Sequence, residues 1–577
     1  MNRNHSAYWI LVMCLFATLA VRSDLRASLG GGEDSVLVPL KPDQREIPYD
    51  EYVPVSRETL PTSPAFKFSS PSFFAVQVNV NDSGRNIVGD AANEPSIAVD
   101  PLNPSRMAIG WRQFNTISSS FRQAGYGYTT DGGFTWRFPG VIEPGVFRSD
   151  PVLDSDSDGN FYYNSLTSVG GLFSCQVFKS TNGGATWDTG TYAFGGDKQW
   201  MTIDKTGSIG NGNIYAFWTS AFSACPPGSF TRSVDRGFSY QSCLTIPNDP
   251  FWGTLTTGPD GELYVFGESS IGFEVVKSTT ARDSTMAVLW DTATAVDLDG
   301  QISAFSGSGS PNPGGLLGQA WVAVDRSNTP TRGNLYALCS VDRFSNFDPL
   351  DVMFARSTDE GLTWSAPVRV NDDTSTTAWQ WFGTMSVAPN GRIDVIWLDT
   401  RDNPGSVNSS LYYAYSFDGG VTWSSNIRLS NSFNPHLGWP QQNKMGDYFD
   451  MVSDDAGAHL AWAGTFNGEQ DVYYGRITTP TSVAEGVQAP TDFALFQNYP
   501  NPFNPRTKIV YRVGSREFVE LGVYDVLGRE VATLVNEVKQ PGRYEVTWDA
   551  SSVASGVYLY RLQAGRFFES RRMLLLR

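Results

Sequence analysis

The sequence predicts an all-β protein, in which a seven-bladed β-propeller, with six blades as the alternative, is followed by a small second β module. Three observations support this prediction. One eight-residue motif recurs five times, apolar strand-like runs recur beside it, and the 577 residues include 56 Gly and 13% aromatic residues. Abundant turns and aromatic side chains are typical of short strands joined by tight loops.

The first 22 residues are predicted to be a secretory signal peptide. Arg3 supplies a positive start, Tyr8 to Ala20 is apolar, and Ala17 to Ala20 offers a small-residue cleavage site. A membrane anchor is the alternative, but the run is shorter than the roughly 20 residues that span a bilayer. No later segment is long and apolar enough, so we expect no transmembrane segment in the mature chain. Residues 23–89 are rich in Pro, Ser and charge and are expected to form a partly disordered N-terminal extension.

The repeated motif is Ser/Thr-x-Asp-x-Gly-x-Thr-Trp, first seen from Thr129 to Trp136. Its Asp or Asn accepts hydrogen bonds within the turn, its Gly adopts positive φ, and its aromatic residue packs the turn against a neighbouring strand. The motif is therefore predicted to close a hairpin. Its structural residues in the five copies are Asp131, Trp136, Asn182, Trp187, Asp235, Tyr240, Asp359, Trp364, Asp418 and Trp423.

Seven repeating units are predicted between residues 90 and 477. The last residues of the five motifs are separated by 51, 53, 124 and 59 positions, and the long interval has room for two units. Four-stranded repeats of about 40 to 50 residues are typical of propeller blades. The expected inner strands begin near Ser96, Val152, Met201, Leu255, Trp321, Met385 and Met451.

With five copies in one chain, the motif resembles the Asp box, or BNR repeat, of the sialidase-like β-propeller superfamily. The resemblance implies a secreted or cell-surface protein that acts on or binds extracellular glycans or glycoproteins. Sialidases themselves commonly have six blades, and the Phe/Tyr-Arg-Ile-Pro motif of their first arginine is absent here. An exo-sialidase-like glycoside hydrolase is one interpretation. A non-catalytic carbohydrate- or protein-binding propeller, adhesin or scaffold is the other.

After a linker over residues 478–492, residues 493–577 contain several short strand-like runs. The stretches Asn498 to Pro505, Val523 to Val531 and Ser555 to Leu562 resemble the type A C-terminal sorting domain of the type IX secretion system. The resemblance implies an immunoglobulin-like β-sandwich that engages the secretion machinery. It also implies a location outside the cell or on the outer-membrane surface of a Gram-negative bacterium.

Candidate site residues lie in the loops that enter the inner strands or follow the second strands, because these loops share the open face opposite the motifs. The sialidase resemblance implies an arginine triad that binds a carboxylate bidentately, an acid, and a tyrosine nucleophile with a glutamate. The catalytic candidates are Arg112, Arg343 and Arg401 for the triad, Asp150 for the acid, and Tyr448 with Glu268 for the nucleophile. Salt bridges, turn caps and packed aromatics are the structural alternatives.

A binding site without catalysis would use aromatic and polar side chains on the same face. Its candidates are Trp200, Trp381, Asp399 and Asp447, with core packing or local ion pairing as the alternative. Convergence of the triad on a Tyr–Glu pair would favour an enzyme. A Trp-lined pocket without the triad would favour a binding protein. A flat or plugged face would favour a scaffold.

Composition excludes other classes of protein. A net charge of −17 argues against a nucleic-acid partner, since phosphate binding needs clustered Lys and Arg. With three His and no Cys-x-x-Cys pair, a zinc site is not expected, and no cofactor is predicted. The acidic run Asp154 to Gly159 leaves a structural calcium ion open, with a solvated turn as the alternative. Cys225 and Cys243 are either a disulfide or two buried thiols.

Overall fold

The computed structural model describes residues 48, 50–221, 223–478, 493–539, 542–565 and 567–576. The predicted signal peptide, the start of the N-terminal extension and almost all of the linker fall outside these residues. The chain divides into two units, residues 1–479 and 480–577. Apart from the single 3-10 turn η2 (Arg57–Thr59), every named element is a β-strand. Within the described ranges, no helix has the length and hydropathy needed to cross a bilayer.

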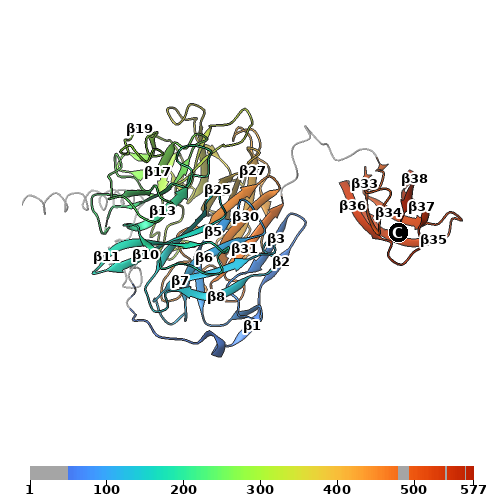
Figure 1. Cartoon of the computed structure of the whole chain (residues 1–577), viewed down its shortest axis with the longest axis horizontal. Helices are drawn as coiled ribbons and strands as arrows, with labels where there is room; N and C mark the ends of the chain where they lie inside the picture. The colour runs from blue at the N-terminus through green and yellow to red at the C-terminus, as the bar shows by residue number, and fades with distance from the viewer. Residues whose placement is uncertain are drawn as a thin grey trace, which may run out of the picture. The chain divides into compact units, whose positions relative to one another are not determined.

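The first unit contains seven sheets that form the blades of a propeller (Figure 1). Blade one is β5 (Ala91–Val99), β6 (Met107–Phe114), β7 (Gln123–Thr129) and β8 (Arg137–Ile142). Blade two is β9 (Ser149–Ser155), β10 (Phe161–Val169), β11 (Leu172–Ser180) and β12 (Thr191–Tyr192). Blade three is β13 (Asp197–Ile203), β14 (Ile214–Thr219) and β15 (Phe230–Ser233). Blade four is β16 (Phe251–Thr257), β17 (Leu263–Ser269), β18 (Gly272–Ser278) and β19 (Thr292–Ala295).

The remaining blades differ in how they are completed. Blade five is β20 (Gly300–Ile302), β21 (Trp321–Val324), β22 (Leu335–Arg343), β23 (Asp351–Ser357) and β24 (Val368–Arg369). Blade six is β25 (Gln380–Val387), β26 (Ile393–Asp399), β27 (Ser410–Ser416) and β28 (Ile427–Arg428). Blade seven is β29 (Asp450–Asp454), β30 (Gly457–Gly464), β31 (Asp471–Thr478), β3 (Phe73–Gln77) and β2 (Lys67–Ser69). A separate two-stranded sheet pairs β1 (Thr62–Pro64) with β4 (Arg85–Ile87).

The inner strands form a closed ring, because β5 contacts β9 at one side and β29 at the other. This confirms seven blades rather than six. The predicted start of the propeller at residue 90 is too late. Strand β3 pairs with β31 over Phe73↔Ile477 to Gln77↔Tyr473, so part of the expected extension completes the last blade.

The five motif turns adopt the hairpin geometry that their sequence predicts. In the first, Thr135 donates its backbone N–H and its hydroxyl to Asp131, at 3.0 and 2.6 Å. Equivalent bonds, from the Thr363 hydroxyl first, lower the pKa of Asp359 to about 2. The motif tryptophan packs on the preceding blade, since the Trp136 ring lies 5.4 Å from that of Tyr474 on β31. Each motif therefore joins two blades as well as closing one hairpin.

Edges of the inner strands face the axis, where unpaired N–H groups need acceptors. Side chains of the adjacent blade supply these acceptors. The backbone N–H of Leu153 on β9 donates to the Ser96 hydroxyl of β5 at 2.8 Å, and Val322 on β21 donates to Thr254 of β16 at 2.9 Å. Asp450 of β29 accepts from the N–H of Ile97 on β5 at 3.0 Å, so the capping also joins the last blade to the first.

A polar seam holds the N-terminal segment against blade seven. Asn79 donates to the buried carboxylate of Asp471 at 2.8 Å, and Asn86 donates to Glu469 at 3.1 Å. Gly89 donates its N–H to the same glutamate at 2.7 Å. Burial first, and then the charge of Glu469, raise the pKa of Asp471 to about 7. A carboxyl group with a raised pKa is thus built into the ring closure.

Of the cysteines in the first unit, Cys225 and Cys243 form a disulfide, which decides between the two predicted alternatives. Cys175 and Cys339 are buried free thiols.

The second unit is a β-sandwich. Its three-stranded sheet contains β32 (Ala494–Leu495), β33 (Arg506–Val513) and β36 (Gly542–Asp549). Its four-stranded sheet contains β34 (Glu517–Tyr524), β35 (Glu530–Lys539), β37 (Gly556–Ala564) and β38 (Phe567–Leu575). Both sheets contribute to one core, with Ile509 and Leu521 as members. The Asn498 N–H donates to the buried Tyr560 hydroxyl at 2.8 Å, which fixes the opening segment to β37.

The close contact between a motif and its neighbouring blade makes one glycine irreplaceable. Gly132 and Gly133 both have positive φ, 79° and 89°, but a Cβ at Gly133 would overlap the Tyr474 ring, whereas one at Gly132 meets open space. We expect Gly133→Ala to lower the free energy of unfolding by about 1–3 kcal/mol more than Gly132→Ala, because only the former adds overpacking to backbone strain. Denaturant unfolding of both variants checks this, and equal losses would contradict it.

Ring closure is expected to weaken as pH rises. The folded-state pKa of Asp471 is raised to about 7, so its contribution to stability is complete below its unfolded value near 4 and is lost as pH passes through 7. As pH rises from 5.5 to 8.5, the unfolding free energy should therefore fall less in Asp471→Asn than in the unmodified protein. The difference is expected to be about 1.4 kcal/mol for each pH unit below the folded-state pKa of about 7. Indistinguishable pH profiles for the two proteins would contradict this role.

Candidate functional site

In five of the seven blades, a β-bulge near the start of the inner strand interrupts its pairing with the second strand. The registers shift between Asn93 and Ser96 on β5, and between Asp197 and Trp200 on β13. Five of the residues at this position have a left-handed backbone, with φ between 48° and 57°: Glu94, Asp150, Lys198, Trp252 and Phe382. Strained non-glycine residues are tolerated where surrounding contacts fix them, and they cluster at functional sites.

Glu94, Asp150 and Lys198 belong to a buried network of charged side chains. This network lies on the loop face, which is the end of the axis opposite the motifs. Arg112 lies 3.0 Å from Glu94, and Lys198 lies 2.9 Å from Asp447. Lys444 contacts the same Asp447 oxygen at 2.8 Å. Burial raises the pKa of Glu94 well above its ordinary range, although Arg112 opposes the shift. Three cations and several carboxylates thus neutralise one another.

Residues 303–318, between β20 and β21, reach this network and cross to the loop before β29. Asn312 donates to the Gly446 carbonyl and accepts from the Met445 N–H, both at 2.8 Å. The Leu316 N–H donates to Asp447 at 2.8 Å. Glu94, Arg112 and Asp150 are completely buried, so these charged groups are not open to solvent at the loop face.

The three predicted triad arginines lie on different blades and contact carboxylates of their own. Arg112 binds Glu94 in blade one. Arg343 binds Asp299 at 2.8 Å and Asp351 at 2.9 Å beside blade five. Arg401 binds Asp399 at 2.8 Å and Asp372 at 2.7 Å in blade six. The structure does not bring them together around one anion.

The predicted nucleophile pair is also separated. The buried Tyr448 hydroxyl donates to the Pro151 carbonyl at 2.8 Å, and burial raises its pKa well above the usual value. Glu268, at the end of β17, accepts the Ile302 N–H at 3.3 Å, and burial raises its pKa to about 7. The carboxylates whose charge acts on Tyr448 are instead Glu94 and Asp150. Asp150 contacts Lys198 at 3.6 Å.

The predicted binding residues are internal. Trp381 is fully buried and donates its indole N–H to Ser409 at 3.0 Å. Asp399 accepts the indole N–H of Trp397 at 2.7 Å, and Asp447 belongs to the loop-face network. Trp200, which is 6% exposed, lines a cavity.

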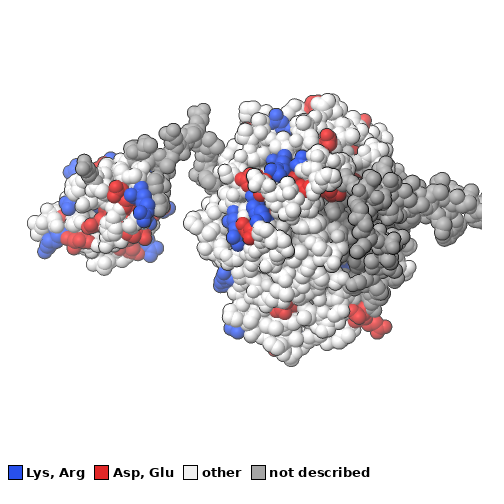
Figure 2. Space-filling model, turned by 180° about the vertical axis from the view of Figure 1, so that it is seen from behind, with Lys and Arg blue, Asp and Glu red and all other residues white. Residues whose placement is uncertain are grey.

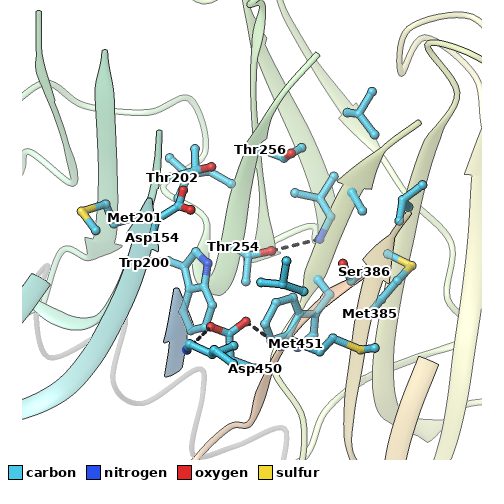
Figure 3. Close-up of a pocket in the computed structure, with 18 of the residues that line it drawn as sticks. Asp154, Trp200, Met201, Thr202, Thr254, Thr256, Met385, Ser386, Asp450 and Met451 are labelled. Carbon is cyan, nitrogen blue, oxygen red and sulfur yellow. Dashed lines mark hydrogen bonds between the residues drawn. The ribbon is translucent and has the colours of Figure 1, made fainter. Parts of the chain in front are cut away.

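That cavity, of about 170 Å³, is lined by residues of the inner strands (Figure 3). Met107 pairs with both Val99 and Thr129, so the inner strands end on the same face as the motifs, here called the motif face. Lining residues come from all seven inner strands. The sequence analysis expected a site at the other end of the axis, where the loops are longest.

Three successive rings line the cavity from its closed end outward. The floor ring contains Trp200, Thr254, Trp321 and Asp450. The middle ring is apolar in every blade and at most 5% exposed: Ile97, Leu153, Met201, Leu255, Val322, Met385 and Met451. The outer ring contains Asp154, Thr202, Thr256, Ala323, Ser386 and Val452, most of them partly buried.

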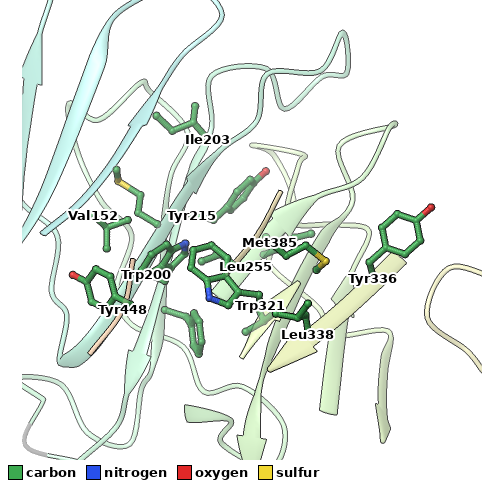
Figure 4. Packing of buried hydrophobic residues seen from close by; sticks show 14 of the residues in the cluster. Val152, Trp200, Ile203, Tyr215, Leu255, Trp321, Tyr336, Leu338, Met385 and Tyr448 are labelled. Atoms are coloured by element: carbon green, nitrogen blue, oxygen red, sulfur yellow. The ribbon is translucent and has the colours of Figure 1, made fainter. Parts of the chain in front are cut away.

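Aromatic side chains close the floor. The Trp200 ring lies 5.0 Å from Trp321 and 5.2 Å from Tyr448, both edge-to-face (Figure 4). Burial raises the pKa of Asp450, which borders this floor, to about 7. At the mouth, Lys205 contacts Asp154, and Arg326 donates to the Thr257 carbonyl at 2.8 Å. Sequence reasoning named Trp200 and Tyr448 but missed Trp321, Asp450 and Arg326, because inner-strand side chains look like ordinary core positions.

The acidic run considered for calcium is engaged by protein groups. Asp156 accepts the backbone N–H groups of Asp158 and Asn160 at 3.0 and 2.9 Å, and Asp158 pairs with Arg236. In the part of the chain that the structure describes, no group of three or more His, Cys, Asp or Glu is arranged to hold a metal ion. On the surface shown in Figure 2, basic and acidic side chains are interspersed.

Comparison with known proteins identifies the C-terminal module. Residues 497–575 match the family described as the secretion system C-terminal sorting domain. The chain therefore carries a type IX sorting domain, which engages the secretion machinery and directs the protein to secretion or the outer-membrane surface. No curated protein matches the chain significantly.

Several solved structures resemble the chain at low identity. A Dyadobacter fermentans protein of unknown function is 14% identical, covers 71% of this chain and 100% of its own, and has a TM-score of 0.41. An ulvan lyase of polysaccharide lyase family PL25 is 10% identical over 67% and 93%, with a TM-score of 0.40. Trypanosoma rangeli sialidase is 11% identical over 88% and 90%, with a TM-score of 0.36. Similarities this weak do not define the chemistry of this chain.

The loop-face network predicts a strong dependence on one carboxylate. Asp447 is 1% exposed and contacts both Lys198 and Lys444. We expect Asp447→Ala to lower the free energy of unfolding by about 3–5 kcal/mol, because it leaves buried ammonium groups without this carboxylate. Asp158→Ala, which breaks an exposed pair with Arg236, should change it by at most about 1 kcal/mol. Chemical denaturation measures both, and similar losses would contradict the assignment.

Proposed function

We propose that this protein is an exported propeller that binds extracellular glycans without cleaving them, and that the axial cavity is its sugar-binding site. The observation that carries the proposal is the cavity itself. It combines an aromatic floor of Trp200 and Trp321 with hydroxyl and carboxylate groups at its mouth. Aromatic faces pack against the C–H surfaces of sugar rings, and hydroxyls and carboxylates bond sugar hydroxyl groups.

Binding is favoured over sialidase-type hydrolysis because of the arginine positions. Arg112, Arg343 and Arg401 are each neutralised by carboxylates within or beside their own blades. A carboxylated sugar would have to displace these contacts, which costs more than the new pairing returns when the partner is buried. Export by the sorting domain places the propeller where extracellular glycans are found.

Blocking the cavity tests the proposal. Thr202 lies in the outer ring on β13, and a larger side chain there would fill the mouth. We expect Thr202→Trp to abolish binding of the ligands found on a glycan array, with affinity reduced at least about tenfold in calorimetry. Thr294→Trp, on the outermost strand of blade four, is the matched control and should bind normally.

Two results would overturn the proposal. Equal binding by the Thr202→Trp and Thr294→Trp variants would exclude the cavity. Hydrolysis of a fluorogenic sialoside or another glycoside that is lost in Arg401→Ala would replace the binding function by a glycosidase on the loop face.

A further inference from the structure

Two basic side chains, Lys205 and Arg326, line the cavity at corresponding places in blades three and five. Each follows the last residue of its inner strand, Ile203 or Val324, by two positions. The register carries each of these strand ends through the second strand to the first residue of the blade's motif, so both cations lie on the motif face. Blade four, between them, contributes Thr256 to the same lining.

The guanidinium group of Arg326 is anchored by neutral groups. Its Nε donates to the Thr257 carbonyl at 2.8 Å, and its Nη2 donates to the same carbonyl at 2.5 Å and to the Thr256 hydroxyl at 3.1 Å. Among the residues that the structure describes, none forms an ion pair with this exposed arginine, and none accepts a hydrogen bond from its Nη1. Three carboxylates act on its charge only from longer distances: Asp154, Asp204 and Glu262. One edge of the guanidinium fork is therefore left for a ligand.

This arginine differs from the three that were expected to form a triad. Arg112, Arg343 and Arg401 have carboxylate oxygens at 3.0, 2.8 and 2.8 Å. An anionic ligand at any of those three would compete with a carboxylate of the protein. At Arg326 the ligand would supply the missing counter-charge, and the bonds that anchor the guanidinium to blade four would remain.

The two carboxylates that line the cavity are already bonded within the fold. Asp154 contacts Lys205 and accepts the Ile203 N–H at 2.9 Å. Asp450 accepts the Ser96 hydroxyl at 2.6 Å and two backbone N–H groups at 3.0 and 2.8 Å. Each acid thus has donors from the protein, whereas Arg326 has no acid.

Size and overall charge narrow the choice of ligand further. The cavity holds about 170 Å³, below the roughly 300–1,000 Å³ of pockets for drug-sized ligands, so one terminal sugar unit is the expected occupant. The chain has a net charge of −17 and offers an anion no general attraction. A preference for an acidic sugar must therefore come from local pairing in the cavity.

Building on the proposed glycan-binding function, we infer that the cavity recognises a terminal sugar that carries an oxyanion, either the carboxylate of a uronic acid or a sulfate ester. The oxyanion pairs with the Nη1 edge of Arg326, and Lys205 adds a second positive charge across blade four. The Thr202 hydroxyl, which forms no hydrogen bond with other described residues, is available to a hydroxyl group of the sugar.

Matched pairs of acidic and neutral sugars test the inference on the full chain. Methyl β-D-glucuronide and methyl β-D-glucoside form one pair, and methyl β-D-galactoside with and without a 6-sulfate forms the other. In calorimetry or ligand-observed NMR, we expect the acidic member of at least one pair to bind about tenfold more tightly. The pair that shows this advantage distinguishes a carboxylate from a sulfate. Equal or weaker binding of both acidic members, while a neutral sugar still binds in the cavity, would overturn the inference and leave the proposed function standing.

A matched pair of variants locates the preference. Arg326→Gln should remove the advantage of the acidic sugar and leave the affinity for its neutral partner unchanged. Arg137→Gln removes the same charge from an exposed position on β8, the outermost strand of blade one, and should keep the advantage. An unchanged advantage in a folded Arg326→Gln protein would contradict the assignment.

Thermal unfolding shows whether Arg326→Gln is folded, since the substitution also removes the bonds to blade four. If it is unfolded, Arg326→Lys supplies the readout. It keeps the positive charge without the fork and should reduce the acidic-to-neutral affinity ratio several-fold, and an unchanged ratio would contradict the inference. Failure of the proposed function has a different result, namely no sugar binding at all or binding unaffected by Thr202→Trp.

Discussion

Seven strand edges meet at the axis of this propeller, and their N–H groups must find acceptors in a narrow space. Side chains of one blade accept backbone N–H groups from the next blade. Ser96 accepts from Leu153, Thr254 from Val322, and Asp450 from Ile97. In each of these pairs the capping side chain lies one blade before the strand that it caps, so the bonds link neighbouring blades. The N-terminal segment completes the ring through β3 and the polar seam at Asp471.

This capping determines the chemistry of the axial cavity. Thr254 and Asp450, which line the inner end of the cavity, are held by hydrogen bonds to backbone groups of the neighbouring strands. Nearer the motif face, the lining includes Asp154, Thr202 and Ser386.

At the other end, bulges turn Glu94, Asp150 and Lys198 into left-handed conformations and bring them together. Their charges are neutralised by Arg112, Lys444 and Asp447 and covered by residues 303–318. Titratable residues in strained conformations are usual at active sites; here Glu94, Asp150 and Lys198 are buried and lie in contact with other charged groups. Charge type and loop position alone do not distinguish these two outcomes.

The sequence by itself determined the repeat architecture, the seven inner strands, the motif hairpins and the exported C-terminal module, because these depend on local turn chemistry and on strand periodicity. It placed Trp200 near a site but assigned Arg112, Arg343 and Arg401 to one triad. Tertiary structure decided otherwise, since each arginine found carboxylates in its own part of the ring. Which end of the axis stays open depends on residues 303–318 meeting Asp447, a contact between segments more than 100 residues apart. Such contacts leave no periodic pattern in the sequence, so this contact could be found only in the folded structure.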